Sequence, residues 1–127
     1  MTTTGGNCKT ILVVEDDFEI RNILCELLEL EGYDVHSAGN GKEGLDLLPK
    51  MEEPCLILLD LMMPVMDGFE FLHAKKRYLK IAPIPVVIIS ALDPGMEPPG
   101  AAKFIKKPIQ IDTLLQVVRE YCGMPSK

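Results

Sequence analysis

Polar residues follow several short apolar runs in this chain, and their types suit chemistry at a shared site. Asp60 comes directly after the continuous apolar run Cys55–Leu59. A run of this kind, followed by turn residues, is typical of a buried central strand of a parallel sheet. The carboxyl ends of parallel strands lie at one edge of the sheet, where ligands bind in open α/β folds. The residues at such strand ends are Glu15, Asp16, Asp60, Ser90 and Lys107.

Carboxylates gathered at one sheet edge repel one another, so the site needs positive charge. A hard divalent cation supplies it, and Mg²⁺ suits carboxylate oxygens combined with water. Lys107 adds an ammonium and Ser90 adds a hydrogen-bond donor. This combination suits phosphoryl transfer, with one carboxylate as the nucleophile. The alternative is that the acids only cap loops and helices and that Lys107 is solvated, but the coincidence of all these residues at strand ends favours a shared site.

The elements that must position these residues alternate strands with helices. This alternation predicts an α/β fold, with a parallel sheet covered by helices on both faces. The half-polar strand Tyr33–Ala38 is expected at the sheet edge. The helix Phe69–Leu79 is expected to bury Phe69, Leu72 and Leu79. The predicted strands are Lys9–Val14, Tyr33–Ala38, Cys55–Leu59, Pro85–Ile89 and Lys103–Lys106, and the predicted helices are Phe18–Glu31, Gly41–Leu48, Phe69–Leu79 and Ile111–Tyr121.

Length and charge limit the classes of function. A chain of 127 residues is expected to form one domain over residues 8–122, between a disordered tail at 1–7 and a short tail at 123–127. The net charge of −6 disfavours nucleic-acid binding. No stretch is long and apolar enough to predict membrane insertion. The four cysteines, at positions 8, 25, 55 and 122, lack C-x-x-C spacing and are interpreted as reduced core residues of a cytoplasmic protein.

Three glycines imitate a cofactor-binding motif. Gly39, Gly41 and Gly44 have the G-x-G-x-x-G spacing of a dinucleotide site, after a strand and at the start of a helix. The preceding strand is polar for a central strand, and the chain is short for two nucleotide-binding halves. A dinucleotide site would also leave the strand-end acids and lysine without a role. We therefore expect no organic cofactor here, and interpret the glycines as loop and helix-start residues.

Four motifs together resemble the receiver domain of two-component response regulators. They are I-L-V-V-E-D-D at Ile11–Asp17, L-L-D-L-M-M-P-V-M-D-G at Leu58–Gly68, V-V-I-I-S-A at Val86–Ala91 and F-I-K-K-P at Phe104–Pro108. They occur in the order of the family and span most of the chain, and the second motif is highly specific. The resemblance implies a flavodoxin-like, doubly wound sheet of five parallel strands in the order 2-1-3-4-5.

The resemblance also implies a chemical role for the acids. Asp60 would accept a phosphoryl group from the phosphohistidine of a sensor histidine kinase or a phosphotransfer protein. The chain would then be no enzyme with a separate substrate, but a signalling domain that catalyses its own phosphotransfer and slow autodephosphorylation. The Mg²⁺ ligands implied by position are Glu15, Asp16, Asp60 and the main-chain carbonyl of Met62.

Three further residues match the switch of the family. Ser90 resembles the hydroxyl residue that turns toward the acyl phosphate, and Lys107 resembles the lysine that pairs with it. Phe104 stands where an aromatic residue changes rotamer on activation. The resemblance also implies that the peptide bond between Lys107 and Pro108 is cis, a form that proline permits. Phosphorylation would in this way change a surface that binds a downstream protein.

The sequence departs from the family between Ser90 and Lys107. Only 16 residues, Ala91–Lys106, must form both a loop and the last strand, and they include three prolines and two glycines. Because an interior proline costs a helix about 3 kcal/mol and a glycine about 1 kcal/mol, we expect the fourth helix of the family to be shortened or replaced by a Pro/Gly-rich loop. This departure keeps a second hypothesis open, a phosphorylation-independent interaction module with the receiver fold.

Overall fold

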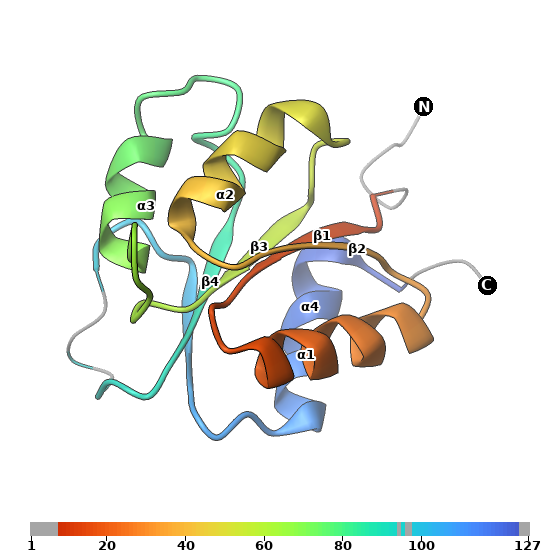
Figure 1. Ribbon diagram of the computed structural model, residues 1–127. Helices are drawn as coiled ribbons and strands as arrows, with labels where there is room; N and C mark the ends of the chain where they lie inside the picture. The colour runs from red at the N-terminus through yellow and green to blue at the C-terminus, as the bar shows by residue number, and fades with distance from the viewer. Residues whose placement is uncertain (1–7, 94, 96–97, 125–127) are drawn as a thin grey trace.

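Five strands form one parallel sheet through the middle of the molecule (Figure 1). The computed structural model describes residues 8–93, 95 and 98–124, so the predicted tail at 1–7 and most of that at 123–127 lie outside the described residues. The strands are β1 (Thr10–Val14), β2 (Asp34–Ala38), β3 (Leu56–Leu59), β4 (Val86–Ser90) and β5 (Lys103–Lys106). Their order is β2-β1-β3-β4-β5, and every neighbouring pair is parallel. The predicted topology is confirmed.

Helices cover both faces of the sheet. They are α1 (Phe18–Leu30), α2 (Gly41–Leu47), α3 (Gly68–Lys75) and α4 (Ile111–Cys122), with a 3₁₀ turn η2 (Leu48–Lys50) after α2. Figure 1 shows α1 and α4 on one face and α2 and α3 on the other. No helix in the described part of the chain has the length and apolarity that a membrane crossing requires.

The central strands are continuous apolar runs because both of their faces are buried. In β1, Ile11 and Val13 join the core under α1 and α4, whereas Leu12 and Val14 join the core under α2 and α3. All four side chains are inaccessible to solvent. The polar strand β2 lies at the edge of the sheet, as predicted. The sheet therefore holds the ends of β1, β3 and β4 between two separate hydrophobic cores.

The third helix is shorter than predicted. The prediction that Phe69 and Leu79 are core residues is wrong. The helix ends at Lys75, and Leu79 is 89% exposed in the turn that follows, while Phe69 is 39% exposed. Leu72 is buried as expected. The helix stops where the buried ammonium of Lys75 donates a 2.7 Å hydrogen bond to the carbonyl oxygen of Ala82 and holds the turn. Burial lowers the pKa of Lys75.

No α-helix occurs among the described residues that connect β4 and β5. The expectation that a loop replaces the fourth helix of the family is confirmed for that part of the chain. The side chain of Lys106 in β5 binds the first residues of the β4–β5 connection. Its ammonium donates a 2.7 Å hydrogen bond to the carbonyl oxygen of Ala91 and lies 3.2 Å from a carboxylate oxygen of Asp93. The loop is thus tied to β5 by hydrogen bonds from a single side chain.

The cysteines correct one expectation. Cys55 and Cys122 are joined by a disulfide, with their Cα atoms 5.6 Å apart. Cys55 directly precedes β3 and Cys122 ends α4, so the packing of α4 on the sheet brings together residues 67 positions apart. Residue spacing along the chain gives no sign of such a pair. Cys8 and Cys25 are free thiols, in keeping with the interpretation from sequence.

Candidate functional site

Three carboxylates meet at the carboxyl edge of the sheet. Glu15, Asp16 and Asp60 each offer an oxygen atom, and these atoms all lie within 4.8 Å of one another. Glu15 is 2% exposed and Asp60 is 5% exposed, whereas Asp16 is open to solvent. Two charged groups are thus withdrawn from water beside a third, an arrangement that costs free energy unless cations offset it.

The sheet fixes the two buried acids because its hydrogen bonds continue past the strand ends. The amide of Asp60 donates a 3.0 Å hydrogen bond to the carbonyl oxygen of Val14, and the amide of Glu15 donates a 3.1 Å hydrogen bond to the carbonyl oxygen of Ala38. Both carboxylates therefore start from backbone that belongs to the rigid ladder. This placement was predicted from the position of each acid at the end of an apolar run.

Arg21 also takes part in the site, although its position in the sequence did not predict this. Its guanidinium donates to the carbonyl oxygen of Glu15 at 2.7 Å and to that of Asp16 at 3.5 Å. It also lies over the ring of Phe18, 5.5 Å from the ring centre. Arg21 thus holds the turn between β1 and α1. The only signal for it in the sequence is a basic residue in the first turns of a helix that follows an acidic loop.

Lys107 reaches the cluster from the end of β5. Its ammonium lies 2.9 Å from an oxygen of Glu15 and 3.5 Å from an oxygen of Asp60. Its backbone amide donates a 2.8 Å hydrogen bond to the carbonyl oxygen of Ser90 and so joins the ends of β4 and β5. The Lys107–Pro108 bond is cis, as the resemblance implied. The predicted convergence of the carboxylates and the ammonium is observed.

The pKa values record this balance of burial and charge. Burial raises the pKa of Glu15, the hydrogen bond from Lys107 opposes this, and the charge of Asp60 adds to the rise. For Lys107, burial alone would lower the pKa, but the hydrogen bond with Glu15 and the charge of Asp60 raise it overall. The ammonium therefore stays charged at neutral pH. It offsets only part of the negative charge of three acids.

Ser90 is the last residue of β4, whereas Phe104 lies two residues before the end of β5. Ser90 is fully buried, and its hydroxyl oxygen accepts a 3.1 Å hydrogen bond from the amide of Leu92. Phe104 is half-buried in β5, where it pairs with Ile88 and packs against the core under α2 and α3. The hydroxyl at the last residue of β4 thus holds the first turn of the β4–β5 connection.

The loop after Asp60 is packed tightly against the site. The amide of Met62 lies 3.4 Å from an oxygen of Asp60. A Cβ atom at Gly68 would meet the Asp60 carbonyl oxygen at 2.6 Å, so only glycine fits where α3 begins. Val65 has a φ of 69°, a strained conformation for a β-branched residue. The loop is therefore held in one shape against the end of β3.

Two of the three glycines of the G-x-G-x-x-G spacing, Gly41 and Gly44, have packing roles. A Cβ atom at Gly41 would meet the carbonyl oxygen of Met66 at 2.8 Å, and the amide of Gly41 donates to the same oxygen. A Cβ atom at Gly44 would lie 3.1 Å from a methyl group of Val14. Close contacts of α2 with the sheet and with the loop before α3 account for both glycines, without a bound dinucleotide.

The donor set fits a hard divalent cation. Three carboxylate oxygens converge from the residues that directly follow β1 and β3, one of them from a solvent-exposed side chain, and such ligands suit Mg²⁺ with retained waters. A doubly wound parallel sheet with acids and a lysine at its carboxyl edge defines a class of α/β domain built for phosphoryl chemistry.

The comparisons with known proteins identify the family within this class. The sequence model for the "Response regulator receiver domain" matches residues 11–119, and the chain belongs to that family. It is 38% identical to Sporulation initiation phosphotransferase F of Bacillus subtilis (strain 168), over 91% of this chain and 95% of that protein. It is 35% identical to the DNA-binding regulator RpaA of Synechocystis, over 86% of this chain but only 47% of that protein.

Solved structures agree in fold. The chemotaxis protein CheY4 of Vibrio cholerae matches with a TM-score of 0.82 and 28% identity, over 90% of this chain and 98% of that one. The response regulator TrrA of Thermotoga maritima, solved in complex with Mg²⁺ and beryllofluoride, matches with a TM-score of 0.78 and 28% identity, over 89% of this chain and 98% of that one. The function implied by the sequence motifs, a receiver domain of two-component signalling, is thus shown at the level of the family.

Proposed function

We propose that Asp60 accepts a phosphoryl group from the phosphohistidine of a sensor histidine kinase or a phosphotransfer protein. The observation that carries this proposal is the position of Asp60 at the end of β3, with one oxygen 3.5 Å from the ammonium of Lys107 and the carboxylates of Glu15 and Asp16 beside it. The receiver unit would comprise residues 8–122. The similarity to a sporulation phosphotransferase supports a role in passing phosphoryl groups between proteins.

The transfer exchanges one bond to phosphorus for another. A carboxylate oxygen of Asp60 attacks the phosphorus atom, the bond from phosphorus to the donor imidazole breaks, and the imidazole nitrogen leaves with the bonding electron pair. An acyl phosphate forms on Asp60. Lys107 is already within ion-pair distance of the attacking carboxylate and stabilises the charge on the phosphoryl oxygens. The chain would thereby catalyse its own modification, and no separate substrate is converted.

Mg²⁺ fits this site as the second cation. The carboxylates of Glu15, Asp16 and Asp60 and the main-chain carbonyl of Met62 would hold it. When bound, Mg²⁺ offsets negative charge on the phosphoryl oxygens. Arg21 supports two of these ligands, because it binds the carbonyl oxygens of Glu15 and Asp16 and so fixes their backbone.

Ser90 and Phe104 would carry the signal away from Asp60. The acyl phosphate adds acceptor oxygens at the site, and the Ser90 hydroxyl would turn to donate to them. That turn breaks its present hydrogen bond with the amide of Leu92 and releases the start of the β4–β5 connection. Phe104 would then move into the space that becomes free. A downstream protein would distinguish the two surfaces.

Labelling with a small phosphodonor tests this proposal. Acetyl phosphate with Mg²⁺ should add one phosphoryl group to the protein, detected by intact mass, and Asp60→Asn should abolish the addition. Excess chelator should abolish it too, because the carboxylates would then lack their cation. A matched control is Asp46→Asn, an exposed acid on α2 that should label like the wild type. Full labelling of Asp60→Asn would refute the assignment.

A second function is favoured by one observation. The described residues between β4 and β5 contain no α-helix, so part of the usual signalling surface of the family is changed. A phosphorylation-independent interaction module with the same fold would tolerate this change. Absence of any Mg²⁺-dependent labelling in the folded wild-type protein would favour this alternative.

A further inference from the structure

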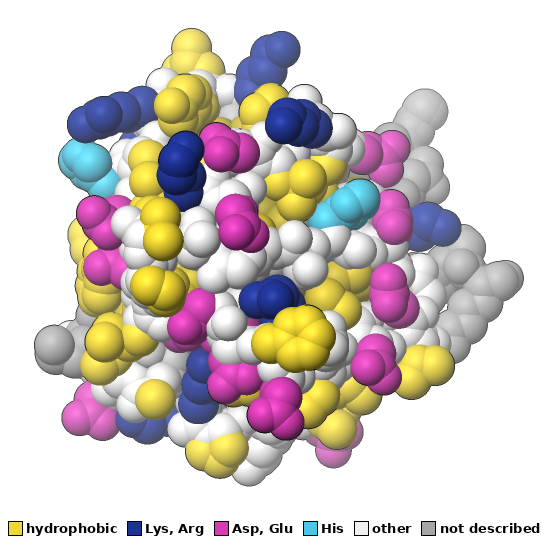
Figure 2. All heavy atoms as spheres, viewed as in Figure 1, with side chains coloured by type: hydrophobic (Ala, Val, Ile, Leu, Met, Phe, Trp, Pro, Cys, Tyr) yellow, Lys and Arg dark blue, Asp and Glu magenta, His cyan; other side chains and the backbone are white. Residues whose placement is uncertain are grey.

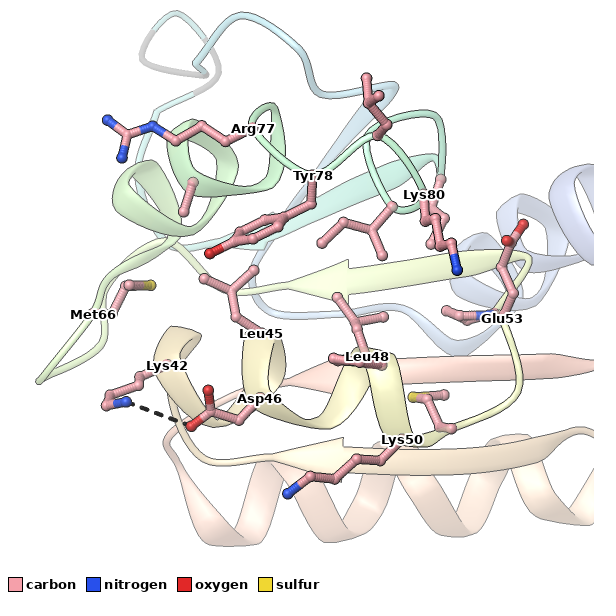
Figure 3. A pocket seen from close by; sticks show the side chains of 17 residues that line it. Lys42, Leu45, Asp46, Leu48, Lys50, Glu53, Met66, Arg77, Tyr78 and Lys80 are labelled. Carbon is pink, nitrogen blue, oxygen red and sulfur yellow. Dashed lines mark ion pairs between the residues drawn. The ribbon is translucent and has the colours of Figure 1, made fainter.

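A groove runs between α2 and η2 on one side and the turn after α3 on the other (Figure 3). Its volume is about 1100 Å³, above the roughly 300–1,000 Å³ of most small-molecule sites. Leu48 and Ile84 form a buried apolar base, and Figure 3 shows Tyr78 reaching across the groove toward Leu45. The space is large and apolar enough to receive side chains of another polypeptide.

The rim of the groove is basic although the chain as a whole is acidic. Four cations and two acids line it, in a chain whose net charge is −6. One cation, Lys42, is paired with Asp46 at 3.5 Å. Among the described residues, Lys50 and Lys80 make no ion pair. Figure 2 shows dark-blue cationic side chains gathered over the part of the molecule where α2 and α3 lie.

Exposed apolar side chains extend the groove at its α3 side. Tyr78 is 56% exposed and Leu79 is 89% exposed, and both line the groove. Arg77 is their neighbour in the chain, and among the described residues its guanidinium makes no ion pair and lies 3.4 Å from a ring nitrogen of His73. Adjacent apolar and cationic side chains that are not matched within the protein mark a surface complementary to an apolar and acidic partner.

We propose that this groove docks an acidic amphipathic segment of a partner protein. Apolar side chains of the segment would pack on Leu45, Tyr78 and Leu79, and its carboxylates would face Lys50 and Lys80. Helix-in-groove recognition uses this combination of apolar anchors and a charged rim. The proposal stands apart from phosphoryl transfer, because none of the residues of the carboxylate cluster lines the groove.

The probe for this proposal is a fluorescein-labelled helical peptide of leucine and glutamate, with leucines at i, i+3, i+4 and i+7 spacing. Fluorescence anisotropy should show saturable binding to the wild type. The charge reversal Lys50→Glu with Lys80→Glu should weaken binding at least about tenfold. The matched control, Lys9→Glu with Lys76→Glu, makes the same change of charge at exposed lysines outside the groove and should bind like the wild type.

A second pair of variants tests the apolar contact without altering charge. Leu79→Ser should weaken binding severalfold, whereas Leu30→Ser, a leucine 77% exposed on α1, should not. Asp60→Asn should bind the peptide like the wild type, so a failure of phosphoryl transfer and a failure of docking are measured separately. No saturable binding, or equal binding by the charge-reversed variant and the wild type, would overturn the proposal.

Three other results would overturn the proposal, because each would show that the groove binds something other than an acidic segment of a partner protein. One is tighter binding of a peptide in which lysines replace the glutamates. Another is displacement of the acidic peptide by a DNA duplex or by phosphatidylglycerol vesicles. The third is self-association of the protein without peptide that the Lys50→Glu and Lys80→Glu reversal abolishes.

Discussion

Replacement of Lys107 by methionine tests the electrostatics of the site most sharply. The change keeps the length of the side chain and removes its charge. At an effective dielectric constant of about 20, the attraction to Glu15 at 2.9 Å is roughly 6 kcal/mol and that to Asp60 at 3.5 Å is roughly 5 kcal/mol. Most of this is offset by the desolvation of the ammonium. Removal of one partner from a buried ion pair costs about 3–5 kcal/mol, and the Lys107 side chain is 18% exposed. We therefore expect Lys107→Met to lower the free energy of unfolding by about 3 kcal/mol at neutral pH without Mg²⁺.

The pH dependence of this loss follows from the two shifted pKa values. The pKa of Glu15 is raised above 4.5 in the folded state, so wild-type stability falls as pH rises through the interval between 4.5 and that pKa. Without Lys107, the pKa of Glu15 rises further, because the hydrogen bond that opposes the rise is gone. Acidification therefore protonates Glu15 and restores stability to the variant. Titration of Lys107 itself limits the stabilisation only on the alkaline side: its folded pKa is raised above 10.5, so the stabilisation persists from neutral pH to 10.5 and is lost as pH rises through that raised value.

Urea unfolding of both proteins from acid to alkaline pH, with the disulfide kept in one state, measures this difference. The loss should be greatest near neutral pH and shrink toward acid. Mg²⁺ should stabilise Lys107→Met more than the wild type, because the cation replaces the missing charge. The control Lys103→Met removes an exposed lysine that also lies 2.9 Å from a glutamate, and it should have little effect. Equal losses for the two variants, or a loss independent of pH, would refute the reasoning.

Three further changes test other parts of the fold and site. Gly68→Ala should destabilise the protein by about 2 kcal/mol in urea unfolding, because the new methyl group would meet backbone atoms at 2.6 and 2.8 Å, and this outweighs the gain in helix propensity of about 1 kcal/mol. The control is Gly95→Ala, whose new methyl group would meet no atom within 4 Å, and it should change the free energy of unfolding by less than about 0.5 kcal/mol. Equal destabilisation by the two substitutions would contradict the packing described at Gly68. Leu92 lies two residues after Ser90, and its amide donates to the Ser90 hydroxyl beside the site of phosphorylation proposed above. Leu92→Gln should speed loss of the phosphoryl group severalfold in a mass-spectrometric time course, because an amide side chain at this position can orient water and leucine cannot; an unchanged half-life would count against this. Reduction of the Cys55–Cys122 disulfide, which closes a loop of 67 residues, should lower the free energy of unfolding by roughly 2–4 kcal/mol, and identical unfolding curves with and without reductant would contradict the pairing.

The sequence predicted the sheet and the charged cluster because both depend on buried parallel strands. Such strands are continuous apolar runs, and β1, β3 and β4 contain no exposed residue. Their ends are therefore visible in the sequence. Since all the strands are parallel, an acid or lysine at each end must reach the same edge. Glu15, Asp60 and Lys107 are found together for this reason.

The features that the sequence did not predict depend on contacts between distant residues, or on charged side chains that bind backbone oxygens. The spacing of apolar residues predicts a helix as far as Leu79, but a buried lysine and its bond to the Ala82 carbonyl end α3 earlier. The disulfide depends on how α4 packs beside the start of β3. Arg21 binds backbone oxygens of the turn before its helix, and a basic residue near the start of a helix is too common a pattern to predict that contact.

A crystal structure with Mg²⁺ and beryllofluoride tests the central claim most directly, because this fluoride imitates a phosphoryl group on a carboxylate. We expect the metal among Glu15, Asp16, Asp60 and the Met62 carbonyl, and beryllofluoride on Asp60 beside the ammonium of Lys107. An empty acidic site at saturating concentrations of both, or a lysine turned away from the bound group, would contradict it.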